Sequence, residues 1–302
     1  MSFKHLLINL GKLLLCGIAF FVGMEIGGMV ASFMGLQAAP MAPGADRNLS
    51  LFYSLLATPL LALVLALVAR GLGGAFVPRT LILSFLTWIV YSVNDQLEGL
   101  LVSTYSTGFW FAVVESLVPS LLCGAAVALL FPPAEEGKEL GVALKTFFAR
   151  RGVGAWVWRL VIASVAFMPI YFIFGLMVLP FVADYYQQNQ YGLQAPSVDH
   201  LFTILFVRSV LFLLACLPIL TVWQESVRSL FFRLGFALFV LVGFPSILIA
   251  YWLPMSLRLP HALEILADEF VYAGVLVALL AKGGASTSRE QTITQPVSHT
   301  VE

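Results

Sequence analysis

The sequence predicts an all-α integral membrane protein with eight transmembrane helices and with both termini in the cytoplasm. Of its 302 residues, 60% are hydrophobic and 11% are charged, whereas a soluble domain is about half apolar and a quarter charged. The apolar residues gather in eight runs of membrane-spanning length, and lysine and arginine concentrate at alternate ends of these runs. The 16 basic and 16 acidic side chains balance, so no nucleic-acid-binding surface is indicated.

Each span is identified by its length, because about 20 apolar residues are needed to cross a bilayer core. The first run follows Lys4 and Lys12, as in a signal peptide, but it continues through "MEIGGMVASFMGL" without a small-residue cleavage site. We therefore interpret it as a membrane helix. The predicted spans are residues 13–36, 51–69, 80–102, 107–131, 156–183, 201–222, 229–253 and 260–281.

The orientation follows from the basic residues, which favour the cytoplasmic side. With the N-terminus inside, the outer segments hold only Arg47 and Arg258, and Arg208 is the one basic residue inside a span. The cytoplasmic segments hold Lys4, Lys12, Arg70, Arg79, Lys138, Lys145, Arg150, Arg151, Arg159, Arg228, Arg233, Lys282 and Arg289. The plasma membrane is the default location for such a chain.

A long cytoplasmic segment divides the spans into two sets of four. We expect a first four-helix half at 1–131, a connector at 132–155, a second half at 156–282 and a disordered tail at 283–302. Within the connector, "GKELGVALKTFFARRG" has one apolar helical face, which is typical of an interfacial helix or of a half-buried connector.

The two sets of spans have the same predicted orientation, which raises the hypothesis of a parallel repeat. An offset of 150 aligns "LFYSLLATPLLALVLAL" with "LFTILFVRSVLFLLACL", and "GAAVALL" with "GVLVALL". The polar residues do not repeat, since Asp95 and Glu98 align with Pro245 and Leu248. The sequence therefore leaves the duplication open.

The acids inside the predicted spans, together with Arg208, all fall in the outer half, with Glu25 the deepest. A charge at the bilayer centre costs roughly 2.5–3.5 kcal/mol on insertion scales, so these groups should face each other or water. They predict a polar site that opens outward, although a purely structural polar network is the alternative. The residues are Glu25, Asp95, Glu98, Glu115, Arg208, Glu264, Asp268 and Glu269.

Helical phase places these residues on faces. His261, Glu264 and Asp268 share one face of the eighth span, from which Glu269 points away. On the third span, Tyr91, Asp95 and Glu98 share a face in the same way. Arg208 needs a carboxylate partner, for which Glu115 or Asp268 is predicted.

The sequence has no phosphate-binding loop, nucleophile elbow or zinc-protease motif, so function is predicted from the charge pattern alone. The first hypothesis is a transporter, or a proton- or cation-coupled carrier, whose ligand is a proton, a cation or a small molecule. It predicts that Glu25 and Arg208 are indispensable.

Two alternatives remain open. The first is a non-catalytic accessory or assembly protein, for which the sequence identifies no protein partner beyond the lipid bilayer. The second is an outward-facing metal-dependent hydrolase, in which His261, Glu264, Asp268 and His200 hold a divalent metal. No other cofactor is indicated.

Overall fold

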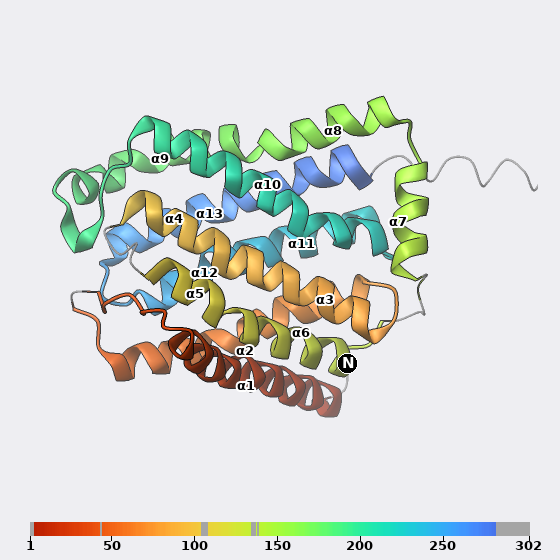
Figure 1. The fold of residues 1–302 in the computed structure, drawn as a ribbon, viewed down its shortest axis with the longest axis horizontal. Helices are drawn as coiled ribbons and strands as arrows, with labels where there is room; N and C mark the ends of the chain where they lie inside the picture. The colour runs from red at the N-terminus through yellow and green to blue at the C-terminus, as the bar shows by residue number, and fades with distance from the viewer. Residues whose placement is uncertain (1–2, 43, 104–107, 134–136, 138, 282–302) are drawn as a thin grey trace, which may run out of the picture.

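The computed structural model describes residues 3–42, 44–103, 108–133, 137 and 139–281. Its helices run back and forth along one long axis, and two isolated bridges are the only β-type pairings among these residues (Figure 1). The protein is therefore an all-α protein with helices of membrane-spanning character, as predicted. The predicted C-terminal tail lies outside the described residues.

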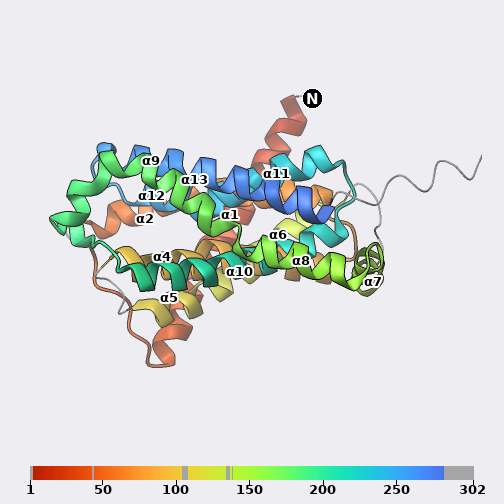
Figure 2. The same ribbon diagram turned by 90° about the horizontal axis from the view of Figure 1, so that it is seen from above.

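The first four spans follow the predicted order, with breaks in the third and fourth. Their helices are α1 (Phe3–Phe33), α2 (Arg47–Gly71), α3 (Phe76–Thr87), the π-helix η1 (Trp88–Val93), α4 (Asn94–Val102), α5 (Phe109–Glu115) and α6 (Leu117–Leu130). The helix α1 begins ten residues before its predicted span, and its first turns project from the bundle (Figure 2). Glycines allow it to pack closely, since backbone atoms of Pro119 and Glu115 occupy the space that a Cβ on Gly23 or Gly27 would take.

A short helix joins the two sets of spans, and the second set follows it. The elements are α7 (Leu140–Ala149), α8 (Val153–Val165), α9 (Phe167–Gln187), the 3-10 turn η3 (Gln190–Gly192), α10 (Val198–Val222), α11 (Val227–Val242), α12 (Phe244–Ile249), α13 (Met255–Leu276) and the π-helix η4 (Val277–Ala281). In Figure 1, α7 stands across the cytoplasmic end predicted from the basic residues, roughly perpendicular to the spans. This is the orientation that a helix lying along a membrane surface requires.

Seven helical segments among the described residues are long and apolar enough to cross a membrane. The eighth predicted span corresponds to α13 and η4, which has the length but carries Glu264, Asp268 and Glu269. All three acids are buried inside the protein, so they do not meet lipid. Because α13 begins at Met255, Asp268 and Glu269 lie about 20 Å along it, deeper than the predicted boundary implied.

Basic side chains stabilise helix ends at the end of the bundle where α7 lies. The guanidinium of Arg79 is 2% exposed and donates hydrogen bonds to the last carbonyls of two helices. Its acceptors are Ala69 in α2, Ala128 in α6 and Phe131 just after α6. The Nζ of Lys12 donates similarly to the carbonyl of Leu130. Carbonyls at helix C-termini lack helical partners and carry partial negative charge, so cations stabilise them.

The two halves meet through a reciprocal pair of backbone hydrogen bonds at the same end. Leu72 pairs with Trp223, which lies 151 positions later. The amide of Gly73 donates to the carbonyl of Val222, and the amide of Gln224 donates to the carbonyl of Gly71. The helices that precede the pair, α2 and α10, are each 25 residues long. Any antiparallel pair of residues shows this reciprocity, so the hypothesis of a repeat stays a prediction.

Neighbouring helices follow the same plan in each half. In the first half α6 packs against α1 and α3, and in the second half α13 packs against α9 and α11. Across the halves, α2 contacts α11, and α10 contacts α3, η1 and α4. This last contact brings α4 of the first half beside the polar residues of the second half.

Candidate functional site

Arg208 lies at the centre of a buried polar cluster. It is 1% exposed, about 15 Å along α10, and its Nη2 donates to Oε2 of Glu98 at 2.9 Å. Its guanidinium carbon lies 5.5 Å from the ring centre of Phe167 and 5.8 Å from that of Tyr171, within the range of cation–π contact. The partner is thus Glu98, and neither of the predicted partners, Glu115 and Asp268, forms this ion pair.

Two further acids lie beside Arg208 on α13. Asp268 is 2% exposed and Glu269 is fully buried. Oδ1 of Asp268, both carboxylate oxygens of Glu269, and Nε and Nη1 of Arg208 have no hydrogen-bond partner among the described residues. These acids and Arg208 line a void of about 10 Å³, which is roughly the space of one water molecule. Buried polar atoms in this state need a proton, a water molecule or a cation to satisfy them.

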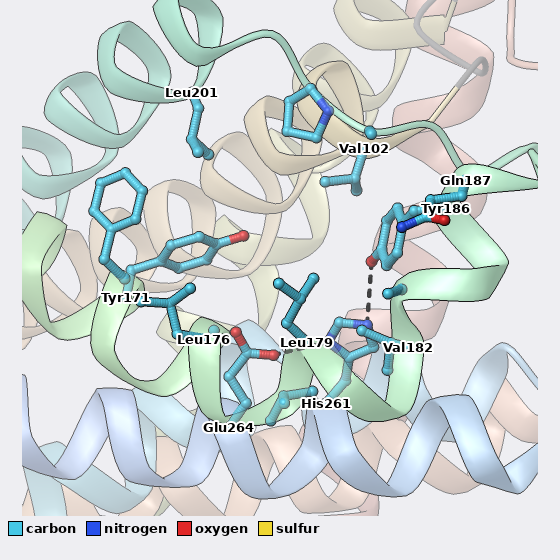
Figure 3. A pocket seen from close by; sticks show the side chains of 16 residues that line it. Val102, Tyr171, Leu176, Leu179, Val182, Tyr186, Gln187, Leu201, His261 and Glu264 are labelled. Carbon is cyan, nitrogen blue, oxygen red and sulfur yellow. Dashed lines mark hydrogen bonds and ion pairs between the residues drawn. The ribbon is translucent and has the colours of Figure 1, made fainter.

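A second group of side chains lies on the outer side of this void. Nδ1 of His261 is 2.9 Å from Oε2 of Glu264, and Nε2 of His261 is 3.1 Å from the hydroxyl of Tyr186 (Figure 3). Both ring nitrogens of His261 are therefore engaged. Glu264 is 7% exposed, and its Oε1 lies next to Gly175 of α9, where a Cβ would be 3.2 Å away. Together with Glu98, Arg208, Asp268 and Glu269, His261 and Glu264 form what we call the polar cluster.

Two cavities lead toward this polar cluster from the predicted outer end. The larger has a volume of about 330 Å³ and extends from Gln187 and Pro196 down α9 to Tyr171. The smaller, of about 180 Å³, is lined by Asp95, Glu98 and Arg258 together with apolar side chains of α11, α12 and α13. Val102, Tyr186 and His261 line both cavities and separate them.

Aromatic side chains close the inner side of the polar cluster. Phe167, Phe212 and Tyr272 are each at most 1% exposed, and their ring centres lie 4.7 to 5.8 Å apart. The hydroxyl of Tyr272 donates to the carbonyls of Ala163 and Ser209 at 3.1 and 3.2 Å, so this layer has its own polar group satisfied. Phe212 and Tyr272 each lie one helical turn beyond Arg208 and Asp268, toward the cytoplasmic end.

The structure thus brings together most of the predicted site residues and separates the others. Glu98, Arg208, His261, Glu264, Asp268 and Glu269 form the polar cluster, and Asp95 lines the smaller cavity beside it. Tyr91 instead points toward α1, where its ring meets Phe20 edge-on at 5.5 Å. The reason is the π-helix η1, in which the amide of Asn94 bonds the carbonyl of Ile89. An α-helical phase cannot be carried across such a turn.

Glu25 and Glu115 lie elsewhere. Glu25 is exposed on the surface of α1, and neither residue lines the cavities described above. They are close enough to interact electrostatically, and Oε1 of Glu115 lies next to Gly28. Helical phase does not tell which neighbouring helix a face meets: α5 contacts α1, η1 and α4, whereas α10 contacts α3, η1 and α4.

The proposed metal ligands are only partly assembled. His261 and Glu264 are in contact, whereas His200 is exposed near the start of α10. Within the described residues, no group of three or more His, Cys, Asp or Glu side chains is positioned to hold a metal ion. A metal at His261 would have to displace one of its two hydrogen bonds.

Sequence reasoning missed the contribution of α9. Tyr171, Gly175, Val182 and Tyr186 lie along the wall of the larger cavity, and three of them touch the polar cluster. The available signal was their spacing of four or seven residues, which puts them on one helical face. Because tyrosine is the only polar residue type on that face, the sequence pattern alone predicts that the face contacts lipid.

Compared with models of protein families, with curated proteins and with solved structures, the chain has no match. We therefore infer its function from the geometry of the polar cluster and the cavities.

Proposed function

We propose that the protein is a membrane carrier coupled to protons or small cations, and that the polar cluster is its coupling site. The observation that carries the proposal is the set of buried, unpartnered oxygens of Asp268 and Glu269 next to the Arg208–Glu98 ion pair. A purely structural network of buried charge would be expected to satisfy such atoms with neighbouring protein groups. Carboxylates that must bind and release a proton or cation, by contrast, need oxygen atoms without a permanent hydrogen-bond partner.

Access to the polar cluster also supports this function. Glu98 is 27% exposed and lines both the smaller cavity and the inner void, so it connects the outer solution with the buried acids. On the other side, Phe167, Phe212 and Tyr272 form an apolar seal. Open access on one side and an aromatic seal on the other is what an outward-open carrier state requires. Because Glu25 is exposed on α1, we assign the coupling role to Asp268 and Glu269 instead.

The test is proton flux into liposomes that contain the purified full-length protein and an entrapped pH-indicator dye. A potassium diffusion potential drives proton entry, and parallel experiments replace protons with radioactive sodium. We expect protein-dependent flux of one of these ions in the parent. Asp268→Asn and Glu269→Gln should each reduce it by at least about tenfold, since each removes one exchangeable charge from the site.

The matched control is Asp199→Asn, which removes an acid from the first turn of α10 outside the cavities. It should leave the flux unchanged. Size-exclusion profiles of all variants establish that they are folded. Absence of protein-dependent flux of either ion in the parent, or equal flux in all variants, would overturn the proposal.

A further inference from the structure

The larger cavity differs chemically from the polar cluster that it adjoins. Most of its lining is apolar and comes from α9, with Leu201 of α10 and Val102 of α4 on the other walls. Its volume of about 330 Å³ is at the lower end of the range of about 300–1,000 Å³ that is usual for small-molecule sites. The polar side chains in its lining are those of Tyr171, Tyr186, Gln187, His261 and Glu264, of which His261 and Glu264 lie side by side on α13 (Figure 3).

The charge on the cavity wall has one sign. Glu264 is the only acid among the 16 lining residues, and none of them is lysine or arginine. Its Oε2 is held by His261, while Oε1 has no hydrogen-bond partner among the described residues. An anionic ligand would find no fixed cation here, whereas a cationic nitrogen would meet a carboxylate and the tyrosine rings.

The position of the cavity indicates how a ligand reaches it. Leu176 and Leu179 line the cavity and are also 66% and 48% exposed on the outer face of α9. Leu176 lies seven residues, about 10 Å, inside the end of the fifth predicted span at residue 183. The rings of Phe172, which lines the cavity, and Phe202 meet at 5.1 Å between α9 and α10. The cavity is therefore bordered by side chains that face lipid in the outer leaflet.

We propose that this cavity binds a hydrophobic amine, with its cationic nitrogen at Glu264 and its hydrocarbon body along Leu176, Leu179 and Val182. The ligand enters from the outer leaflet beside α9. Gly175 leaves the room that this geometry needs, because a side chain there would press on Oε1 of Glu264. The inference rests on the proposed carrier function in one respect, since it identifies the cavity as the substrate site of that carrier.

The test is photolabelling of the full-length protein in lipid nanodiscs with a dodecylamine that carries a diazirine in its chain. A dodecanol with the same diazirine is the uncharged matched probe, and mass spectrometry locates the labelled residues. We expect labelling by the amine at α9 and Leu201 that unlabelled dodecylamine displaces, and at least about tenfold weaker displaceable labelling by the alcohol.

Variants separate charge from shape. Glu264→Gln keeps the side-chain shape and should weaken displaceable amine labelling by at least about tenfold, because a charge-assisted contact is lost. Leu201→Trp fills the cavity with Glu264 intact and should abolish labelling. Asp199→Asn removes an acid at the same end of α10 and should have no effect. Thermal unfolding of each variant in the nanodisc shows whether it is folded.

The outcomes decide between the two proposals. Equal labelling by amine and alcohol, labelling unaffected by Glu264→Gln, or no displaceable labelling of the folded parent would each overturn the inference. Amine binding without ion flux would refute the carrier function and leave the amine site standing. Ion flux without amine binding would do the reverse.

Discussion

The ion pair between Arg208 and Glu98 offers the most direct test of the polar cluster. Glu98→Gln keeps the shape of the side chain but leaves the guanidinium without its hydrogen-bonded anion. Removing one partner of a buried pair typically costs about 3–5 kcal/mol. Glu98 is 27% exposed, and Asp268 and Glu269 supply other negative charge nearby, so we expect the lower end, about 3 kcal/mol.

The double variant Glu98→Gln/Arg208→Met measures whether the pair acts as a unit. After Glu98→Gln the guanidinium stays charged, because it cannot lose its proton in a protein. After Arg208→Met the carboxyl groups left without a cation can be protonated. The double variant should therefore lose less stability than the two single changes added together, by about 1–3 kcal/mol. Unfolding by titration of sodium dodecyl sulfate into a mild detergent gives the four free energies. Additivity within about 0.5 kcal/mol would refute the reasoning.

Three more predictions concern positions where the structure gives a single physical cause. Gly71→Ala should cost about 1–3 kcal/mol in the same unfolding assay, because its methyl group would overlap the indole ring of Trp223. Gly11→Ala is the control: its methyl group would meet no neighbouring atom, so this change should be neutral or slightly stabilising. Arg79→Met should cost about 2–4 kcal/mol, since three carbonyls lose the guanidinium and only that of Ala69 keeps another donor among the described residues, the amide of Leu72; a loss below about 1 kcal/mol would show that water replaces the guanidinium. Tyr272→Phe removes a hydroxyl that bonds two carbonyls and should cost about 1–2 kcal/mol in the same unfolding assay. Because the aromatic layer stays in place, liposomes with this variant should leak ions no faster than liposomes with the parent protein.

Much of the architecture could be predicted because it depends on composition. The apolar runs identified the helices of membrane-spanning length, and the acids of α13 identified the region of the polar cluster. The orientation inferred from the basic residues stays a prediction. Residue pairing could not be predicted in the same way. Whether Arg208 meets Glu98 or Glu115 depends on which helices are neighbours, and the local sequence does not contain that information. Arg79 shows the same limit, since a basic residue near a span end looks alike whether it faces solvent or caps buried carbonyls.

If the chain is a parallel repeat, which stays a prediction, the polar cluster uses only one of two equivalent places in it. With the spacing of 151 that the bridge between Leu72 and Trp223 defines, Arg208 corresponds to Ala57 and Glu98 corresponds to Ile249. The equivalent of the ion pair is therefore apolar, and α2 and α12, which carry these residues, do pack together. A structural role common to both halves would leave polar residues at both places. Polar residues at only one of the two places, together with the cavities that reach them, are the pattern expected when one half of a repeat keeps the binding residues and the other half has a structural role.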